Sequence, residues 1–383
     1  MTFLKNLPIL FLVAGLMSGN LCGAEELRDD RWPQALEMAE FILSAQLPSG
    51  AIPDTVGGLG VNQDSTMEYA LIGLAAAYEA TKNPKYLRGL ESGIEWLADR
   101  EEMSDPMWKG SWFLTYNVNP PFDDLPTPQG DPNILDVRGV DATSALFVYL
   151  LYLDKRVSHS EELAKKYERN ARAALNFVVK NNLDSDGFSW SSWQLFASDN
   201  QWHLFKFKYS ADQGDVYLGM QAGSLLYDDE KYERIACGLR TRGPEVFFSP
   251  AERRYGLGID NSGTLDTSTN GFIEGFANGY LSWMWGRIPE NQAAIEWFRS
   301  TVQADGSVVT LDGQPSFSLN VAMLGLGDLG VRQREPTASF RWLLANTFDP
   351  GTGGVGDSPL AKDTQFSNVT SFTEISLLGF PAF

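Results

Sequence analysis

The chain has 383 residues, of which 43% are hydrophobic and 21% are charged, so it carries enough apolar material for a large core. Its 49 acidic residues outnumber its 30 basic ones, which gives a net charge of -19 at pH 7. This charge opposes binding to the phosphates of nucleic acids. The composition therefore indicates a globular protein and argues against a nucleic-acid partner.

The N-terminal residues 1–24 have the pattern of a secretory signal peptide. Lys5 precedes an apolar run over residues 7–17, and small residues follow up to Ala24. The run is too short for a membrane span, which needs roughly 20 residues. We expect cleavage near Ala24 and a secreted or periplasmic protein. Removal of Cys22 would leave Cys237 as the one thiol, without a disulfide partner in the chain.

Six stretches rich in Ala, Leu, Gly and aromatic residues recur along the chain, each after a polar or Gly-rich segment. Their uniform apolarity predicts helices that are buried on nearly all sides. They cover residues 64–83, 141–156, 212–229, 266–286, 316–330 and 369–380.

Amphipathic segments alternate with these apolar stretches and predict outer helices that shield them. They cover residues 31–46, 84–101, 160–181, 229–240, 289–303 and 335–347. Six outer helices and six inner helices fit one all-α domain over residues 25–383, a closed ring of helical hairpins known as an (α/α)6 toroid.

Several predicted outer helices end in similar turns, including QLPSG at 46–50, DSDGFSW at 184–190 and QADGS at 303–307. These turns resemble those of six-hairpin glycosidases, polysaccharide lyases and terpenoid cyclases. The resemblance implies the toroid architecture and leaves the chemistry open. The segment 44–97 is also similar to pectate-lyase hairpins, which keeps uronate chemistry as an alternative.

The predicted connections from outer to inner helices are long, notably 104–140, 183–210 and 241–265, whereas those from inner to outer helices are short. Long loops on a rigid scaffold commonly carry binding and catalytic residues. We therefore expect the site on the face where the inner helices begin.

Carboxylates stand at the predicted starts of four inner helices. Each is a potential helix cap, but carboxylates that share one pocket also shift one another's pKa values, as acid/base catalysis requires. Glu68 either binds substrate or closes a polar network inside the ring. We predict Asp141, with Asp212 or Asp215, as the catalytic pair, and Asp64, Glu68 and Asp266 as ligands of substrate hydroxyls.

Aromatic residues are concentrated in the long connections. They either pack beneath the loops or stack on the apolar faces of sugar rings. We predict sugar contacts from Trp112, Trp190, Trp193, Trp202 and Tyr209, and we expect the loop from 183 to 210 to form one wall of a substrate funnel.

The pattern favours a secreted glycoside hydrolase that cleaves an oligo- or polysaccharide with a pair of carboxylates and no cofactor or metal. One alternative is a polysaccharide lyase, in which Tyr209 or His203 removes a proton and Arg138 or a lysine neutralises a uronate. In the hydrolase interpretation, Arg138 and His203 instead orient the substrate. A further alternative is a glycan-binding toroid without activity.

Overall fold

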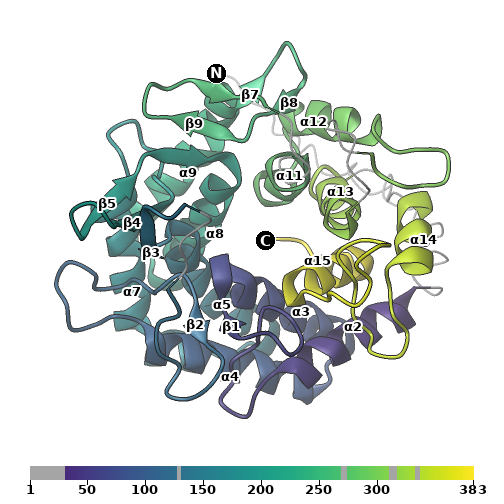
Figure 1. The fold of residues 1–383 in the computed structure, drawn as a ribbon, viewed down its shortest axis with the longest axis horizontal. Coiled ribbons are helices and arrows are strands. Elements are labelled where there is room, and N and C mark those ends of the chain that lie inside the picture. The colour runs from purple at the N-terminus through teal and green to yellow at the C-terminus, as the bar shows by residue number, and fades with distance from the viewer. Residues whose placement is uncertain (1–30, 127–130, 269–273, 310–316, 333–336) are drawn as a thin grey trace, which may run out of the picture.

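The computed structural model describes residues 31–383 except 127–130, 269–273, 310–316 and 333–336, so the predicted signal peptide lies outside the described residues. Inner helices form a closed ring in which each contacts the next and the last returns to the first (Figure 1). The ring consists of α3 (Thr66–Thr81), α5 (Asp141–Ser158), α8 (Ser210–Tyr227), the π-helical η3 (Glu274–Tyr280) with α11 (Leu281–Trp285), α13 (Ser318–Gly330) and α15 (Ser367–Leu378).

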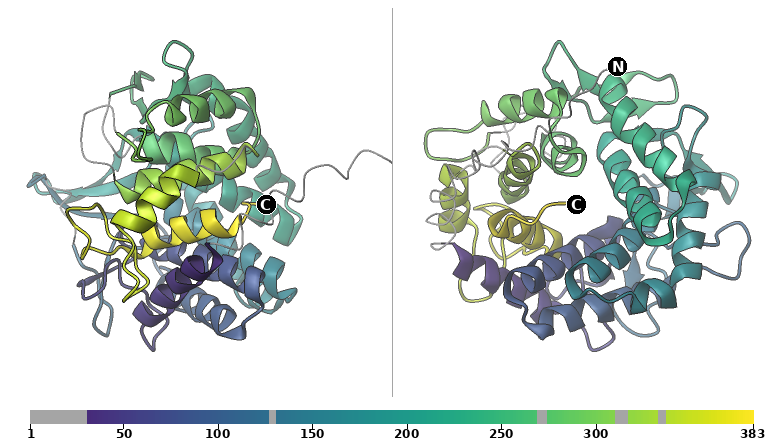
Figure 2. Two further views of the ribbon diagram at one scale, coloured as in Figure 1. Left: turned by 90° about the vertical axis from the view of Figure 1, so that its right-hand side faces the viewer. Right: turned by 180° about the vertical axis from the view of Figure 1, so that it is seen from behind.

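Amphipathic helices surround this ring and cover its apolar outer side (Figure 2). They are α2 (Trp32–Ala45), α4 (Pro84–Arg100), α6 (Glu162–Lys166) with α7 (Glu168–Phe177) and the π-helical η2 (Val178–Asn182), α9 (Glu230–Phe247), α12 (Pro289–Arg299) and α14 (Thr337–Asn346). The predicted (α/α)6 toroid is thereby confirmed. No helix among the described residues is both long enough and apolar enough to cross a bilayer.

Two predicted boundaries are wrong. Helix α9 continues past residue 240 through Pro244 to Phe247, although proline normally ends a helix. Tertiary packing overrides that signal, because Gly243, Pro244 and Phe247 are buried and a Cβ atom on Gly243 would meet the ring of Trp285 at 2.2 Å. The third long connection therefore begins at residue 248 and not at 241.

The fourth inner helix does not begin at Asp266. This residue lies in strand β10 (Leu265–Asp266), which pairs with β9 (Gly258–Asp260), and described helix resumes at Glu274. The side chain of Glu274 lies outside the described part of the chain.

The recurrent turns at the ends of outer helices are structural. In two of them, Gly50 and Gly306 have φ angles of +97° and +94°, which favour glycine. A Cβ atom on Gly50 would lie 2.2 Å from the carbonyl oxygen of Ser92, and one on Gly306 would lie 2.3 Å from that of Ala338. The glycine thus allows these two turns to pack directly on the backbone of a neighbouring outer helix.

Among the described residues, short strands form four small sheets in the connections between helices, and none lies in the centre of the ring. The three-stranded sheet β3 (Ile134–Arg138), β4 (Ser192–Phe196) and β5 (Gln201–Phe205) is antiparallel. A second joins β6 (Phe207–Tyr209) to β9 and β10. The two-stranded sheets pair β1 (Gly60–Val61) with β2 (Tyr116–Asn117) and β7 (Phe248–Ser249) with β8 (Arg254–Tyr255). The predicted all-α domain did not include these strands.

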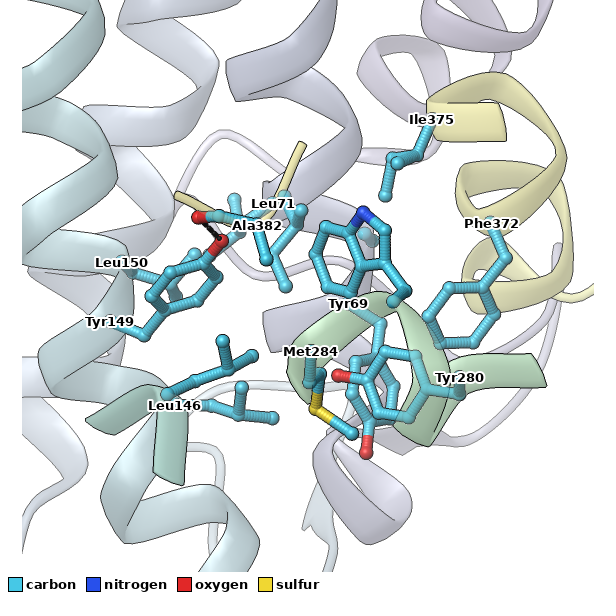
Figure 3. Packing of buried hydrophobic residues seen from close by; sticks show 14 of the residues in the cluster. Tyr69, Leu71, Leu146, Tyr149, Leu150, Tyr280, Met284, Phe372, Ile375 and Ala382 are labelled. Carbon is cyan, nitrogen blue, oxygen red and sulfur yellow. Dashed lines mark hydrogen bonds between the residues drawn. The ribbon is translucent and has the colours of Figure 1, made fainter. Parts of the chain in front are cut away.

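The segment that follows α15 turns into the centre of the ring (Figure 1). Tyr149 donates a hydrogen bond of 2.6 Å to the carbonyl oxygen of Ala382, and Trp283 donates one of 3.0 Å to that of Phe380. Figure 3 shows the Tyr149 bond among the apolar side chains of the inner helices. This segment links α5 to α11 from inside the ring.

We expect the Tyr149→Phe variant to lower the free energy of unfolding by about 1–3 kcal/mol, because the carbonyl group of Ala382 loses its buried donor. The matched control is Tyr152→Phe, since the Tyr152 hydroxyl has no hydrogen-bond partner among the described residues. Denaturant unfolding measures both. Equal stability of the two variants would show that the bond does not stabilise the ring.

Candidate functional site

A cavity of about 750 Å³ opens at the end of the ring where the inner helices begin, and we call it the funnel. Residues at the starts of α3, α5, α8 and α15 lie at its inner end, and the long connections form its walls. Its polar lining comprises Gln63, Asp64, Thr66, Tyr69, Asp131, Ser191, Ser192, Gln194, Tyr209, Ser210, Asp212 and Asn368; its apolar lining includes Leu114, Ile134, Val137, Val140, Phe196, Phe205, Leu257 and Phe276.

Two carboxylates reach the inner end of the funnel. Asp64 is open to solvent on the funnel side and is surrounded by protein on its other sides, and this enclosure raises its pKa. Asp212 lies in the first turn of α8 and is half-buried. Burial raises its pKa well above the ordinary value, and the charges of Asp64 and Asp215 raise it further.

The backbone that carries Asp64 is strained. Asn62, Asp64 and Ser65 have φ angles of 64°, 52° and 64°, a left-handed conformation that residues other than glycine adopt at a cost. Such conformations occur where function requires a side chain in a particular place. The short 3-10 turn η1 (Gln63–Ser65) therefore presents Asp64 to the funnel instead of capping α3 with it.

Two further carboxylates lie beneath the funnel surface. Asp141, the first residue of α5, is fully buried and accepts a hydrogen bond of 2.8 Å from the backbone N–H of Ala142. Asp215, also buried, accepts hydrogen bonds from the hydroxyl groups of Tyr280 at 2.8 Å and Tyr69 at 3.1 Å. Figure 3 shows these two tyrosines near one another in the core. Neither carboxylate lines the funnel.

The pKa values of both buried carboxyl groups are raised, chiefly by burial. The charge of Asp212 raises the pKa of Asp141 further. For Asp215, the hydrogen bonds from Tyr280 and Tyr69 counteract part of the effect of burial. The carboxyl groups of Asp64, Asp141, Asp212 and Asp215 interact through their charges, and we call them the carboxylate cluster.

Glu68 does not line the funnel. It is fully buried in the first turn of α3, where Asn62 donates a hydrogen bond of 3.1 Å to its Oε1 atom. Burial raises the pKa of Glu68 to about 8. Asn62 also accepts a hydrogen bond from the backbone N–H of Met67, so Glu68 belongs to the polar network that fixes the start of α3. Asp266 is held in β10 and does not line the funnel either.

The predicted tryptophans do not line the funnel. Paired residues of adjacent strands point to the same side of a sheet, and β3, β4 and β5 place Trp193 and Trp202 on the side opposite Gln194 and Phe205. Both indoles pack edge-on against Trp108 instead. Trp190 is buried with the Nζ atom of Lys208 4.0 Å from its ring centroid.

Trp112 is also buried, and its Nε1 atom donates a hydrogen bond of 2.8 Å to the carbonyl oxygen of Leu97. The connection from 183 to 210 does form a wall of the funnel, but it contributes Ser192, Gln194, Phe196 and Phe205 together with Tyr209, the one predicted aromatic that lines the cavity.

Arg138 and His203, both predicted to contact substrate, do not line the cavity, although His203 pairs with Gln194 on the funnel side of the sheet. Arg138 is on the same side of the sheet as Trp193, with its guanidinium carbon 4.3 Å from the ring centroid of Trp108 and 4.5 Å from that of Phe113. Lys208 is buried and bound to Asp184 at 2.8 Å and Asp186 at 2.6 Å. His203 contacts Asp199 at 2.8 Å. No arginine, lysine or histidine lines the cavity among the described residues.

Phe196, Phe205, Gln194 and Asp131 line the funnel and were not predicted as site residues. A signal was present, because residues 192–196 and 201–205 are two apolar-rich runs separated by a polar turn at 197–200, a pattern typical of a β-hairpin. The described side chains contain no group of three or more His, Cys, Asp or Glu residues suited to a metal ion.

No family model matches this chain, and no curated protein matches it. Several solved structures, however, match this chain in fold. A cellobiose 2-epimerase from Spirochaeta thermophila is 13% identical, with a TM-score of 0.68 over 94% of this chain and 98% of that one. An unsaturated glucuronyl hydrolase from Bacillus sp. GL1 is 11% identical, with a TM-score of 0.62 over 91% and 96%.

An α-amylase from Clostridium perfringens is 13% identical, with a TM-score of 0.63 over 91% of this chain and 98% of that one. At such low identity the likeness concerns the fold alone. Over nearly its whole length, this chain has the six-hairpin toroid fold found in glycosidases and related sugar-converting enzymes.

Proposed function

We propose that the protein is a secreted glycoside hydrolase that cleaves a neutral oligo- or polysaccharide bound in the funnel. The carboxylate cluster carries this proposal, because two of its members face the cavity with raised pKa values and unequal surroundings. Glycoside hydrolysis commonly needs one carboxyl group that donates a proton and a second that is ionised. The cluster provides carboxyl groups for both roles.

Asp212 is assigned as the general acid. Its pKa is raised well above the ordinary value by burial and by the charges of Asp64 and Asp215, so it retains a proton that it can donate to the glycosidic oxygen. Asp64 is more open to solvent and is assigned as the carboxylate that activates water or attacks the sugar. Of the residues predicted as the catalytic pair, Asp212 is therefore the one assigned to contact the substrate, because it alone of Asp141, Asp212 and Asp215 lines the funnel.

Asp141 and Asp215 act as positioning residues in this proposal. Both lie behind Asp212, and both contribute to the electrostatic environment in which the funnel carboxyl groups hold their protons. The hydroxyl groups of Tyr69 and Tyr280 fix the orientation of Asp215.

The walls of the funnel suit an uncharged sugar. Phe196, Phe205 and Phe276 offer apolar rings, which stack on the C–H faces of pyranosides. Gln63, Gln194 and Asn368 offer amide groups, which both donate hydrogen bonds to hydroxyl groups and accept them.

A lyase is disfavoured because β-elimination from a uronate requires neutralisation of its carboxylate. Arg138 and Lys208 are held by aromatic rings and aspartates outside the funnel, and a uronate in the funnel would instead meet Asp64 and Asp212. Repulsion between these groups would oppose its binding.

The function is tested by incubating the mature protein with a panel of neutral and uronate-containing polysaccharides. We expect new reducing ends from a neutral glycan, with no ultraviolet absorbance from an unsaturated uronide. Chromatography of the products separates hydrolysis from epimerisation, which changes the sugar without breaking the chain. Binding without any product would instead support a glycan-binding toroid.

We expect Asp212→Asn and Asp64→Asn each to lower turnover at least about 100-fold, because each removes one of the two carboxyl groups of the cluster that line the funnel. Asparagine tolerates the left-handed backbone at residue 64, so the fold should persist. Steady-state kinetics measures the loss of turnover. Thermal unfolding checks that each variant is folded.

The matched control is Asp131→Asn. Asp131 lines the same funnel outside the carboxylate cluster, and it accepts hydrogen bonds from Asn133 that an amide oxygen can replace. The turnover of the Asp131→Asn variant should stay within a few-fold of that of the parent. If the three variants lose activity equally, the assignment of Asp212 and Asp64 is wrong.

We expect Phe205→Ala to weaken glycan binding by about 1–3 kcal/mol, since this ring lies on the funnel side of the sheet. Trp202→Ala should leave affinity unchanged, because its indole packs against Trp108 on the other side. Calorimetric titration of both variants with the preferred glycan tests this. A greater loss from Trp202→Ala would reverse the assignment of the two sides.

A further inference from the structure

A second cavity, of about 700 Å³, lies on the outer layer of the ring and shares no lining residue with the funnel. It is formed by α6, α7 and η2 together with the connection that follows α4. Its lining contains six basic side chains and one acidic one, Glu168. We call it the basic groove and define it by Lys109, Lys165, Lys166, Arg169, Arg172 and Lys180.

The basic groove is positively charged, whereas the molecule as a whole has a negative net charge. The chain has a net charge of -19, yet six of its 30 basic residues line one groove. Such a local excess creates an attractive potential for anions on a surface that otherwise repels them.

Three of these cations have acidic partners. Lys165 binds Glu161 at 2.8 Å, Lys166 binds Glu95 at 2.6 Å, and Arg172 binds Glu168 at 2.8 Å. These are solvent-exposed pairs, which are weak and are readily exchanged for other anions.

The other three cations, Lys109, Arg169 and Lys180, are exposed and make no ion pair within the described residues. The buried carboxyl group of Glu101 lies near Lys109 and Arg169. Burial raises its pKa to about 8, so it is mostly protonated at neutral pH and does not neutralise them. These cations are therefore available for a ligand.

The cations are arranged in a line. Lys165, Arg169, Arg172, Asn176 and Lys180 follow one another at intervals of three or four residues along α6, α7 and η2, and all five line the groove. At 1.5 Å per residue this line extends over roughly 20 Å. A line of this length matches an extended polyanion better than a single small anion.

The residues that line the groove indicate which class of polyanion it suits. Phe177 is the one aromatic residue in the groove and it is buried, so the groove offers no exposed ring for the stacking of nucleic-acid bases. The groove is concave, whereas a membrane surface favours a flat or protruding patch. Asn176 accepts a hydrogen bond from Lys231 through Oδ1, which leaves its Nδ2 group for the hydroxyl of a sugar.

We propose that the basic groove binds an acidic polysaccharide through the carboxylate or sulfate groups along its chain. Lys109, Arg169 and Lys180 make the principal contacts, and the amide of Asn176 contacts neutral hydroxyl groups. The groove is separate from the funnel, so it would hold the protein on an acidic glycan while the funnel remains free. This proposal does not depend on the proposed hydrolase activity.

The test uses the full mature protein and a triple variant, Lys109→Gln, Arg169→Gln and Lys180→Gln. Affinity for polygalacturonate and for dextran sulfate is measured by titration at several salt concentrations. We expect the parent to bind with a strong dependence on salt, and we expect the variant to bind at least tenfold more weakly with a smaller salt dependence. Circular dichroism and thermal unfolding verify its folding.

A control variant, Arg88→Gln, Arg287→Gln and Arg341→Gln, loses the same charge from exposed positions elsewhere. It should bind within about twofold of the parent. The proposal is overturned if the parent binds neither glycan, if both triple variants lose affinity equally, or if single-stranded DNA or anionic vesicles bind this groove more tightly than the glycans. None of these readouts requires activity in the funnel.

Discussion

Four carboxyl groups, two at the inner end of the funnel and two buried beneath it, oppose one another's ionisation, and this constraint governs the chemistry of the site. Burial contributes most to the raised pKa values of Asp141, Asp212 and Asp215, and their mutual charges add to it. No basic side chain lines the cavity in the described part of the chain, so none offsets the mutual repulsion of these carboxyl groups there.

The same constraint affects stability. Because the pKa values of these groups are higher in the folded state than in the unfolded one, the folded state binds more protons between the two values. Their contribution is fully favourable below the unfolded pKa and is lost as the pH rises toward the folded one. The rest of the ring must therefore hold the cluster in place, through contacts such as those of Tyr69 and Tyr280 with Asp215.

Much of the fold is predictable because its signal is long and periodic. Six apolar stretches alternating with amphipathic ones suffice for the ring and for the face on which the inner helices begin. Local boundaries were less predictable: the outer segment was predicted to end at residue 240, but α9 continues through Pro244 to Phe247, where Gly243 packs against Trp285. Asp266 suggested a helix start, but it pairs in β10.

The site was predictable only in part. Asp64, Asp212 and Tyr209 were found because they immediately precede or begin inner helices, and the ring brings such positions together. Whether Phe205 or Trp202 faces the funnel depends on strand register, because successive residues of a strand point to alternate sides of the sheet. Arg138 likewise seemed close to Asp141 in sequence, but its strand directs it to the aromatic side of the sheet.

The central claim is that the carboxylate cluster retains a proton at neutral pH, and infrared difference spectroscopy tests it most directly. The spectrum of the parent minus that of Asp212→Asn is recorded across the pH range. The account predicts a protonated carboxyl band that persists at pH 7 and disappears only at higher pH, as burial and the neighbouring charges require. A carboxyl group that ionises near its ordinary pKa of 3.8 would contradict it.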